Sequence, residues 1–330
     1  MGYDGKIMRR ALQKFEEDRQ EREKRLQERR ESIFGRQPRL REIDNELHST
    51  MSRIIASALR RGTDPRPAVE RLRDENLSLQ EEKRMLLARM GLPADALEEQ
   101  PACALCGDTG YRGGTVCRCL RDYYAREQQK ELSRMLDLGS QSFDTFSLEW
   151  YSGSYNPELG ISERDNMEWI KNTCRKYAEA FRSGSGNLLF TGKPGLGKTH
   201  LSAAIAREVS GDGWSVVYDT AAHVFERFEA RKFDREDEEA DSDTERVLSC
   251  DLLILDDLGT EMTTAFVQSA LYQIVNTRLL EKKATIISTN LSPEELARRY
   301  TPQLASRIEG EYQMLPFAGQ DIRKLKKERC

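Results

Sequence analysis

The sequence predicts an α/β fold in its second half, with a parallel sheet covered by helices on both faces. A helical N-terminal region and a small cysteine-rich module precede it. Two observations predict the sheet: short apolar runs typical of buried strands recur from residue 187 onward, and segments of helical pattern separate them. The third observation is compositional. Charged residues make up 33% of the 330 residues and dominate the N-terminal third, so a sizeable core can form only in the second half.

We expect four parts along the chain: a charged helical or coiled-coil adaptor region (1–99), a cysteine module with a helix (100–136), a linker (137–162) and the α/β domain (163–330). In the first part acidic and basic residues alternate, as in a solvated helix or a partner-binding arm, and amphipathic segments with heptad-spaced leucines follow. This pattern indicates protein–protein contact and no chemistry.

Four cysteines in the second part have the spacing C-x2-C-x10-C-x-C, and they are Cys103, Cys106, Cys117 and Cys119. In a chain without a secretory signal, such a cluster favours a metal over disulfides. Four thiolates suit Zn²⁺, and a loop this small would depend on the metal for its stability. We therefore expect a structural zinc site; reduced thiols and an iron–sulfur site are the alternatives.

The α/β domain opens with the most specific motif. Asn187–Thr191 is a short apolar run typical of a buried strand, and Gly192–Thr199 matches G-x-x-x-x-G-K-[ST]. Glycines let backbone N–H groups surround anionic oxygens, and the helix that follows adds the positive end of its dipole. We expect Lys198 to reach the β- and γ-phosphates and Thr199 to ligate Mg²⁺. The expected nucleotide contacts are Gly192, Lys193, Pro194, Gly195, Leu196, Gly197, Lys198, Thr199, His200 and Asp256, with simple packing as the alternative for His200.

A second strand is expected at 215–218, and the acidic stretch 234–243 is expected to be a solvated loop. The third strand ends in Asp256 and Asp257. Asp256 should hold Mg²⁺, directly or through water, and Asp257 should polarise the attacking water. Glu261 is the alternative catalytic carboxylate, and the alternative to catalysis is that Asp257 or Glu261 caps the next helix.

The fourth strand ends at Asn290, and a fifth is expected at 312–315. Because parallel strands line up at the carboxyl edge of a sheet, Asn290 could hydrogen-bond the γ-phosphate or the lytic water. Its alternative role is a helix cap, which Ser292 fits better. Aromatic residues between 143 and 155 should pack the linker onto the domain, although one of them could line an adenine pocket. Together these segments indicate a nucleoside triphosphatase that uses ATP and Mg²⁺.

Composition excludes some classes. The net charge of −4 argues against a uniformly basic nucleic-acid coat. No apolar run is long enough to span a bilayer, and the N-terminus lacks the apolar core of a secretory signal. We therefore expect a cytoplasmic protein without a membrane partner.

The second half of the sequence, residues 140–328, resembles AAA+ ATPases, in particular bacterial helicase loaders of the DnaC and DnaI type, with IstB-type transposition helpers as close relatives. The matching stretches are 192–200, 253–261, 287–290, 304–308 and 319–323. The cysteine segment, with its Cys-Gly-Asp-Thr-Gly, also resembles the zinc module of DnaI-type loaders.

The resemblance implies roles for two arginines. Arg307 matches the arginine finger that reaches a neighbouring subunit's ATP site, and Arg323 matches the sensor-2 arginine that contacts the γ-phosphate in its own subunit. A surface arginine or a structural ion pair is the alternative for each. The resemblance also implies single-stranded DNA binding, with Arg227, Arg231 and Lys232 and the basic tail 324–329 as candidates.

The resemblance further implies an ATP-driven loader of the replicative DNA helicase, active in the primosome. Its ATPase domains would self-associate, and its N-terminal helices and zinc module would grip the helicase. Two alternatives stay open: a transposition helper ATPase that binds duplex DNA, and a nucleotide-gated scaffold that binds ATP without hydrolysing it.

Overall fold

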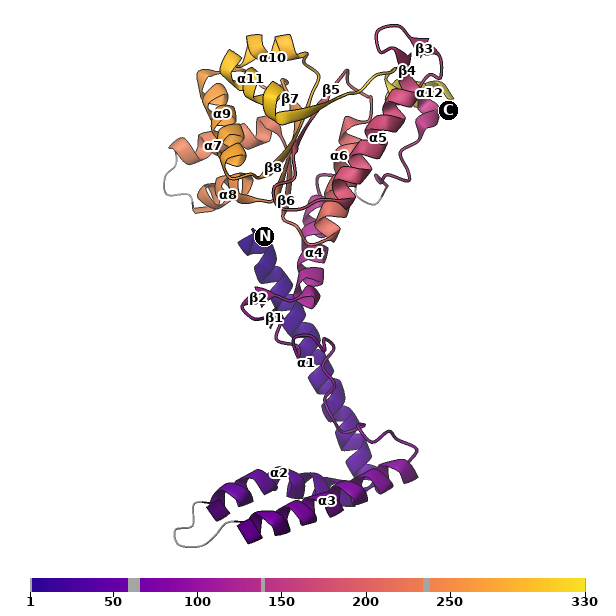
Figure 1. The fold of residues 1–330 in the computed structure, drawn as a ribbon, viewed down its shortest axis with the longest axis vertical. Helices are drawn as coiled ribbons and strands as arrows, with labels where there is room; N and C mark the ends of the chain where they lie inside the picture. The colour runs from indigo at the N-terminus through magenta and orange to yellow at the C-terminus, as the bar shows by residue number, and fades with distance from the viewer. Residues whose placement is uncertain (1, 59–65, 138–139, 234–237, 330) are drawn as a thin grey trace. The chain divides into compact units, whose positions relative to one another are not determined.

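The computed structural model describes residues 2–58, 66–137, 140–233 and 238–329 (Figure 1). Contacts divide the chain into two compact units: Met1–Gln13 with Val116–Cys330, and Lys14–Thr115. In these described ranges, every helix is too short or too polar to cross a bilayer.

The larger unit is built on a parallel five-stranded sheet with the order β6-β7-β8-β5-β9. The strands are β5 (Asn187–Thr191), β6 (Val216–Thr220), β7 (Leu252–Leu258), β8 (Ala284–Thr289) and β9 (Tyr312–Pro316). All five strands that the sequence predicted are present. Their carboxyl ends share one edge, which brings the phosphate loop and the acidic pair together.

Helices cover both faces of this sheet, as Figure 1 shows, so the predicted α/β fold is confirmed. Leu188 and Phe190 face the core under α5 and α6, whereas Leu189 faces the core under α7 and α9. The helices are α4 (Arg118–Leu132), α5 (Glu163–Glu179), α6 (Lys198–Gly211), α7 (Ala221–Phe233), α8 (Glu238–Ser249), α9 (Ala265–Leu280), α10 (Pro293–Arg299), α11 (Pro302–Glu311) and α12 (Ile322–Arg329), with a 3-10 turn, η1 (Leu148–Trp150), and a hairpin of β3 (Tyr155–Asn156) and β4 (Ile161–Ser162).

One expectation about this unit is wrong. Residues 238–243 belong to helix α8 and are not a loop. Thr244 and Val247, three residues apart, are buried on one side of that helix, and this burial fixes a helical segment despite its acidic composition. Residues 234–237 lie outside the described ranges.

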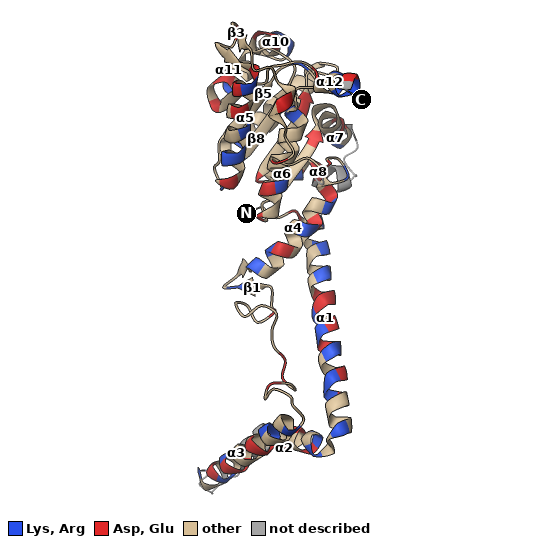
Figure 2. Ribbon diagram, turned by 90° about the vertical axis from the view of Figure 1, so that its right-hand side faces the viewer, with Lys and Arg blue, Asp and Glu red and all other residues tan. Residues whose placement is uncertain are grey.

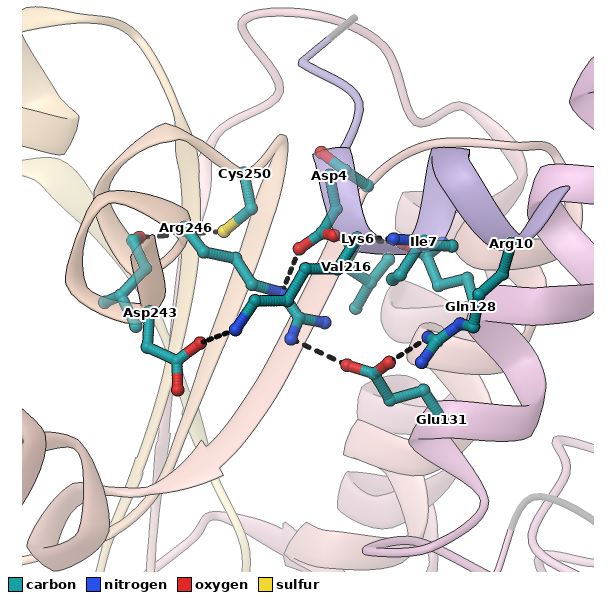
Figure 3. Close-up of polar contacts among 12 residues, drawn as sticks. Asp4, Lys6, Ile7, Arg10, Gln128, Glu131, Val216, Asp243, Arg246 and Cys250 are labelled. Carbon is teal, nitrogen blue, oxygen red and sulfur yellow. Dashed lines mark hydrogen bonds and ion pairs between the residues drawn. The ribbon is translucent and has the colours of Figure 1, made fainter. Parts of the chain in front are cut away.

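The first residues of the chain pack on the larger unit (Figure 3). Ile7 and Ala11 are fully buried and form a small core with Tyr124 of α4. Asp4 pairs with Arg246 of α8 at 2.6 Å. We expected residues 1–99 to form one adaptor region, but this apolar and ionic contact groups the first thirteen positions with the larger unit.

The smaller unit consists mainly of helices. Helix α1 (Gly5–Arg36) continues into it from the docked N-terminal segment, and Figure 2 shows mixed charges along the helix. Helices α2 (Pro38–Ala58) and α3 (Arg66–Arg89) pack on each other, with Arg39 donating to both carboxylate oxygens of Glu82 at 2.9 and 3.0 Å. The side chains of residues 51 and 53–58 lie outside the description. Two short strands, β1 (Tyr111–Arg112) and β2 (Thr115–Val116), lie in the cysteine loop, where the chain passes from the smaller unit to the larger one.

Candidate active site

The phosphate loop connects β5 to α6 and has the geometry that its sequence predicts. Gly192, Gly195 and Gly197 have φ values of 134°, 80° and 89°, which side chains rarely adopt. A Cβ at position 195 would lie 2.0 Å from an Asp321 carboxylate oxygen. The loop is therefore enclosed by the segment that precedes α12, and Ile322 donates its N–H to the Gly195 carbonyl at 3.0 Å.

Lys198 lies inside the curve of the loop. Its side chain is buried, and Nζ donates to the carbonyl oxygens of Gly192 at 2.6 Å and Lys193 at 3.0 Å. Burial lowers the pKa of Lys198, while the charges of Asp257 and Asp256 act in the opposite direction. An ammonium group held among carbonyls can exchange them for phosphate oxygens.

Thr199 and Asp256 meet as predicted. The Thr199 hydroxyl donates to Asp256 Oδ2 at 3.0 Å, and Asp256 is only 2% exposed at the end of β7. Tyr218 of β6 donates to the same oxygen at 2.6 Å, and Ser288 of β8 donates to Oδ1. A hydroxyl beside a buried carboxylate is the hard oxygen set that Mg²⁺ prefers, so these residues fit the metal.

Asp257 leaves the strand with a left-handed φ of 54°, and its N–H donates to the Ser288 hydroxyl at 3.0 Å. Its side chain is exposed to a cavity of about 270 Å³ that the phosphate loop also lines. Partial burial, followed by the charge of Asp256, raises the pKa of Asp257, whereas Lys198 and Arg323 lower it. A carboxylate at this place can accept a proton from water next to the phosphates.

Glu261, the alternative catalytic carboxylate, has a structural role. Its Oε2 accepts the Gly259 N–H at 2.9 Å, and its Oε1 accepts the Tyr300 hydroxyl. Glu261 is 9% exposed and does not line the cavity among the described residues. The cap of α9 is Thr264, whose hydroxyl accepts the Val267 N–H, so neither Asp257 nor Glu261 caps that helix. The geometry favours Asp257 for catalysis.

Three predicted site residues remain: Arg323, Arg307 and Asn290. Arg323, at the start of α12, lines the same cavity as Lys198 and Asp257. Arg307 lies on α11, where its guanidinium stacks 5.5 Å from the Tyr272 ring, outside the described lining of that cavity. Asn290 is exposed after β8, beside Gly259. The structure thus brings Arg323 to the chain's own site and leaves Arg307 away from it.

The linker aromatics pack on the phosphate loop, as expected. Tyr151 is buried, donates its hydroxyl to the Leu196 carbonyl at 2.9 Å and stacks on Phe146. Phe146 and Trp150 also line the cavity. His200 Nε2 lies 2.9 Å from the Ser142 carbonyl, and burial lowers the pKa of this imidazole. His200 therefore tethers the linker and borders the cavity.

The cysteine cluster is assembled. The Sγ atoms of Cys103, Cys106, Cys117 and Cys119 all lie within 4.8 Å of one another. Asp108, at a φ of 57°, accepts the N–H groups of Ala102 at 2.9 Å and Cys103 at 2.8 Å, which shapes the loop beside the first pair. Four thiols at this separation suit a tetrahedral Zn²⁺ site.

Among the residues expected to contact DNA, Arg227 already forms an ion pair within the chain. Its guanidinium pairs with the buried carboxylate of Asp219 at 3.0 Å. Arg231 is exposed on α7, and the side chain of Lys232 is not described. Lys326 of α12 lies 5.7 Å above the Trp150 ring. Lys326 also lines the cavity, so the exposed Lys324 and Lys327 of α12 remain as candidates.

Comparison with known proteins agrees with this geometry. Residues 175–316 match the family model of the IstB-like ATP binding protein. This match confirms the resemblance to IstB-type ATP-binding proteins, and the similarities to DnaC described next confirm the resemblance to helicase loaders of the DnaC type. The chain is 31% identical over 146 residues to the uncharacterized protein YdaV of Escherichia coli (strain K12), a match that covers 44% of this chain and 58% of that relative.

It is also 31% identical over 137 residues to the replicative helicase loader DnaC of the same strain, covering 41% of this chain and 55% of DnaC. The chain thus spans a little over half the length of these curated relatives. A crystal structure of the DnaC helicase loader has a TM-score of 0.44 and 24% identity, covering 53% of this chain and 98% of that one.

Two residues of the site were missed by sequence analysis. Tyr218 and Ser288 both donate to the carboxylate of Asp256, the residue expected to hold Mg²⁺. The available signal was a hydroxyl within each apolar strand that flanks the strand of Asp256.

Proposed function

We propose that this chain is an ATP-dependent loader of the replicative DNA helicase, acting in primosome assembly. The observation that carries the proposal is the union of Lys198, Thr199 and Asp256 in one site, within a region similar to DnaC loaders. A separate helical unit in the same chain supplies a surface for a protein partner. The proposed partners are the replicative helicase, single-stranded DNA and further copies of the chain.

In the proposed reaction, the phosphate loop binds ATP and Lys198 contacts the β- and γ-phosphates. Mg²⁺, held by Thr199 and Asp256, would neutralise charge on those phosphates. Asp257 orients the attacking water and accepts its proton. Arg323, which lines the same cavity, stabilises charge on the γ-phosphate.

The smaller unit is the proposed helicase-binding part. Its α2 and α3 pack as a hairpin with charged outer surfaces, a form suited to pairing with helices of a partner. The cysteine cluster would bind structural Zn²⁺. Neither element contributes a residue to the described lining of the ATP cavity.

The test is co-purification of the intact chain with the replicative helicase of its host. We expect a complex that forms with ATP and is lost when Lys198→Ala removes the phosphate contact. We further expect ATP hydrolysis to respond to single-stranded DNA. A helicase that never co-purifies with the intact chain, with or without ATP, would refute the loader function.

The match to the IstB-like family model favours one second candidate, a transposition helper that binds duplex DNA. The two candidates differ in their DNA substrate. Tighter ATP-dependent binding to duplex than to single-stranded DNA, measured by fluorescence anisotropy at one fixed salt concentration, would favour the helper.

A further inference from the structure

The Asp256 carboxylate receives hydrogen bonds from three hydroxyl groups on three different elements. Thr199 on α6 and Tyr218 on β6 donate to Oδ2 at 3.0 and 2.6 Å, and Ser288 on β8 donates to Oδ1. An ionised carboxylate can only accept, so each hydroxyl must donate its proton to it. With Asp256 only 2% exposed, these donors replace the water that would otherwise solvate its charge.

The three donors are not equivalent. Thr199 is the residue expected to turn toward the metal. Ser288 has a second partner, because its oxygen also accepts the Asp257 N–H at 3.0 Å. Tyr218 is buried to 8% exposure, and its hydroxyl makes this single hydrogen bond among the described contacts.

Strand register explains how Tyr218 reaches the site. Thr220 pairs with Asp256 and Tyr218 pairs with Ile254, so Tyr218 starts two residues before the carboxyl edge. Residues two apart in a strand share a face, and a tyrosine side chain is long enough to lean along the strand to the neighbouring carboxylate.

We infer that Tyr218 is a positioning residue that fixes the orientation of the Asp256 carboxylate for the metal. This inference rests on the proposed ATPase function. When Thr199 turns to the metal, Tyr218 and Ser288 continue to hold one carboxylate oxygen each. The carboxylate can then offer a single-point contact, which suits Mg²⁺ because this ion demands near-octahedral geometry and keeps several waters.

The test compares Tyr218→Phe with the intact wild-type chain. We expect the affinity for a fluorescent ATP analogue in EDTA to stay within about twofold of wild type. The Mg²⁺ concentration that gives half-maximal ATP hydrolysis should rise about tenfold, because the Asp256 carboxylate loses a hydrogen bond. Tyr124→Phe is the matched control, because it removes another buried tyrosine hydroxyl that lies outside the site. That hydroxyl accepts the Asp4 N–H, with 3.0 Å between the two atoms. This variant should leave both values unchanged.

A purely structural role would lower the melting temperature and leave the Mg²⁺ dependence unchanged, and that result would overturn the inference while the ATPase proposal stands. A wild-type chain that binds no ATP analogue with Mg²⁺ would overturn both. If Tyr218→Phe does not fold, Ser288→Ala removes the other fixed donor and should raise the Mg²⁺ requirement in the same direction. An unchanged Mg²⁺ requirement in that variant would also refute the inference.

Discussion

At the scale of single residues, two acidic side chains close in sequence have different environments. Asp257 turns out of β7 at a left-handed φ and faces the cavity, whereas Glu261 is buried against Gly259 and Tyr300. A general base needs access to water, and a carboxylate that already accepts two hydrogen bonds in a buried turn lacks it. This difference supports the proposal that Asp257 accepts the proton, whereas Glu261 supports the turn.

Replacing each carboxylate by its amide separates these roles. Asp257→Asn should reduce ATP hydrolysis about 100-fold or more, with ATP affinity nearly unchanged, because loss of a general base acts on the chemical step. Glu261→Gln should retain hydrolysis and lower the melting temperature. Phosphate release measures hydrolysis, equilibrium binding measures ATP affinity, and thermal unfolding measures the melting temperature of each variant. Unchanged phosphate release in Asp257→Asn would show that hydrolysis does not depend on this carboxylate and would refute its catalytic assignment.

The contiguous residues of the site could be predicted from sequence, and the distant ones could not. Gly192–Thr199 acts through its own backbone, and the acidic pair near the carboxyl end of β7 follows from one strand pattern. Tyr218 and Ser288 acquire their role only when β6 and β8 flank β7, an order that no local pattern specifies. Arg227 shows the reverse case, since its charge suggested DNA but its partner is Asp219, eight residues earlier.

At the scale of elements, the first turns of α1 are held on the larger unit by an ionic network as well as by apolar contact (Figure 3). Arg246 of α8 bridges Asp4 and Glu131, both at 2.6 Å, and Glu131 also accepts from Arg10. Asp4 is only 8% exposed, so removing its partner would leave a nearly buried charge uncompensated. This network was not predictable because each of its ion pairs joins residues more than 100 positions apart.

Arg246→Met should release this segment. Amide hydrogen exchange of residues 5–13 should accelerate at least tenfold, since removing one partner of a buried pair costs about 3–5 kcal/mol and a partly exposed one somewhat less. Lys6→Gln is the control: the Lys6–Asp243 pair is 3.5 Å apart and more exposed, so exchange should change less than threefold. Equal exchange in both variants would mean that apolar packing of Ile7 and Ala11 alone holds the segment.

The same network predicts a pH dependence. Burial opposes ionisation of Glu131, but Arg246 and Arg10 outweigh it and lower the pKa of Glu131. A lowered folded-state pKa stabilises the fold above the unfolded value of about 4.3, and this stabilisation is lost as pH falls through the folded value. Glu131→Gln should therefore lower the melting temperature at pH 7, and its difference from wild type should shrink as pH falls below about 4.3 and disappear below the folded-state pKa of Glu131. A difference that persists at low pH would exclude this charge effect.

At the scale of the whole molecule, we expect the cysteine cluster to stabilise its own loop and the candidate ATP site to work independently of it. Chelation of zinc, or Cys106→Ser, should unfold the loop of residues 102–119, because so small a loop buries little apolar surface. Zinc content should fall from about one ion per chain. ATP affinity should remain within about twofold, since no cysteine lines the described cavity. Loss of helicase binding together with zinc, at unchanged ATP affinity, would support the adaptor role of this loop.

The position of Arg307 bears on assembly. Its guanidinium stacks on Tyr272 at the surface of α11 and does not reach the cavity that holds Lys198, Asp257 and Arg323. If it completes the site of a neighbouring copy, Arg307→Ala chains and Lys198→Ala chains should each be inactive alone. Mixing them should restore part of the ATPase activity, because an intact phosphate loop on one chain would meet an intact Arg307 on the other. Arg323→Ala offers the contrast: mixed with Lys198→Ala it should restore none, since both residues serve the same chain's cavity. Failure of the Arg307→Ala mixture to recover activity, at concentrations where the wild-type chain self-associates, would leave Arg307 as a surface residue stacked on Tyr272.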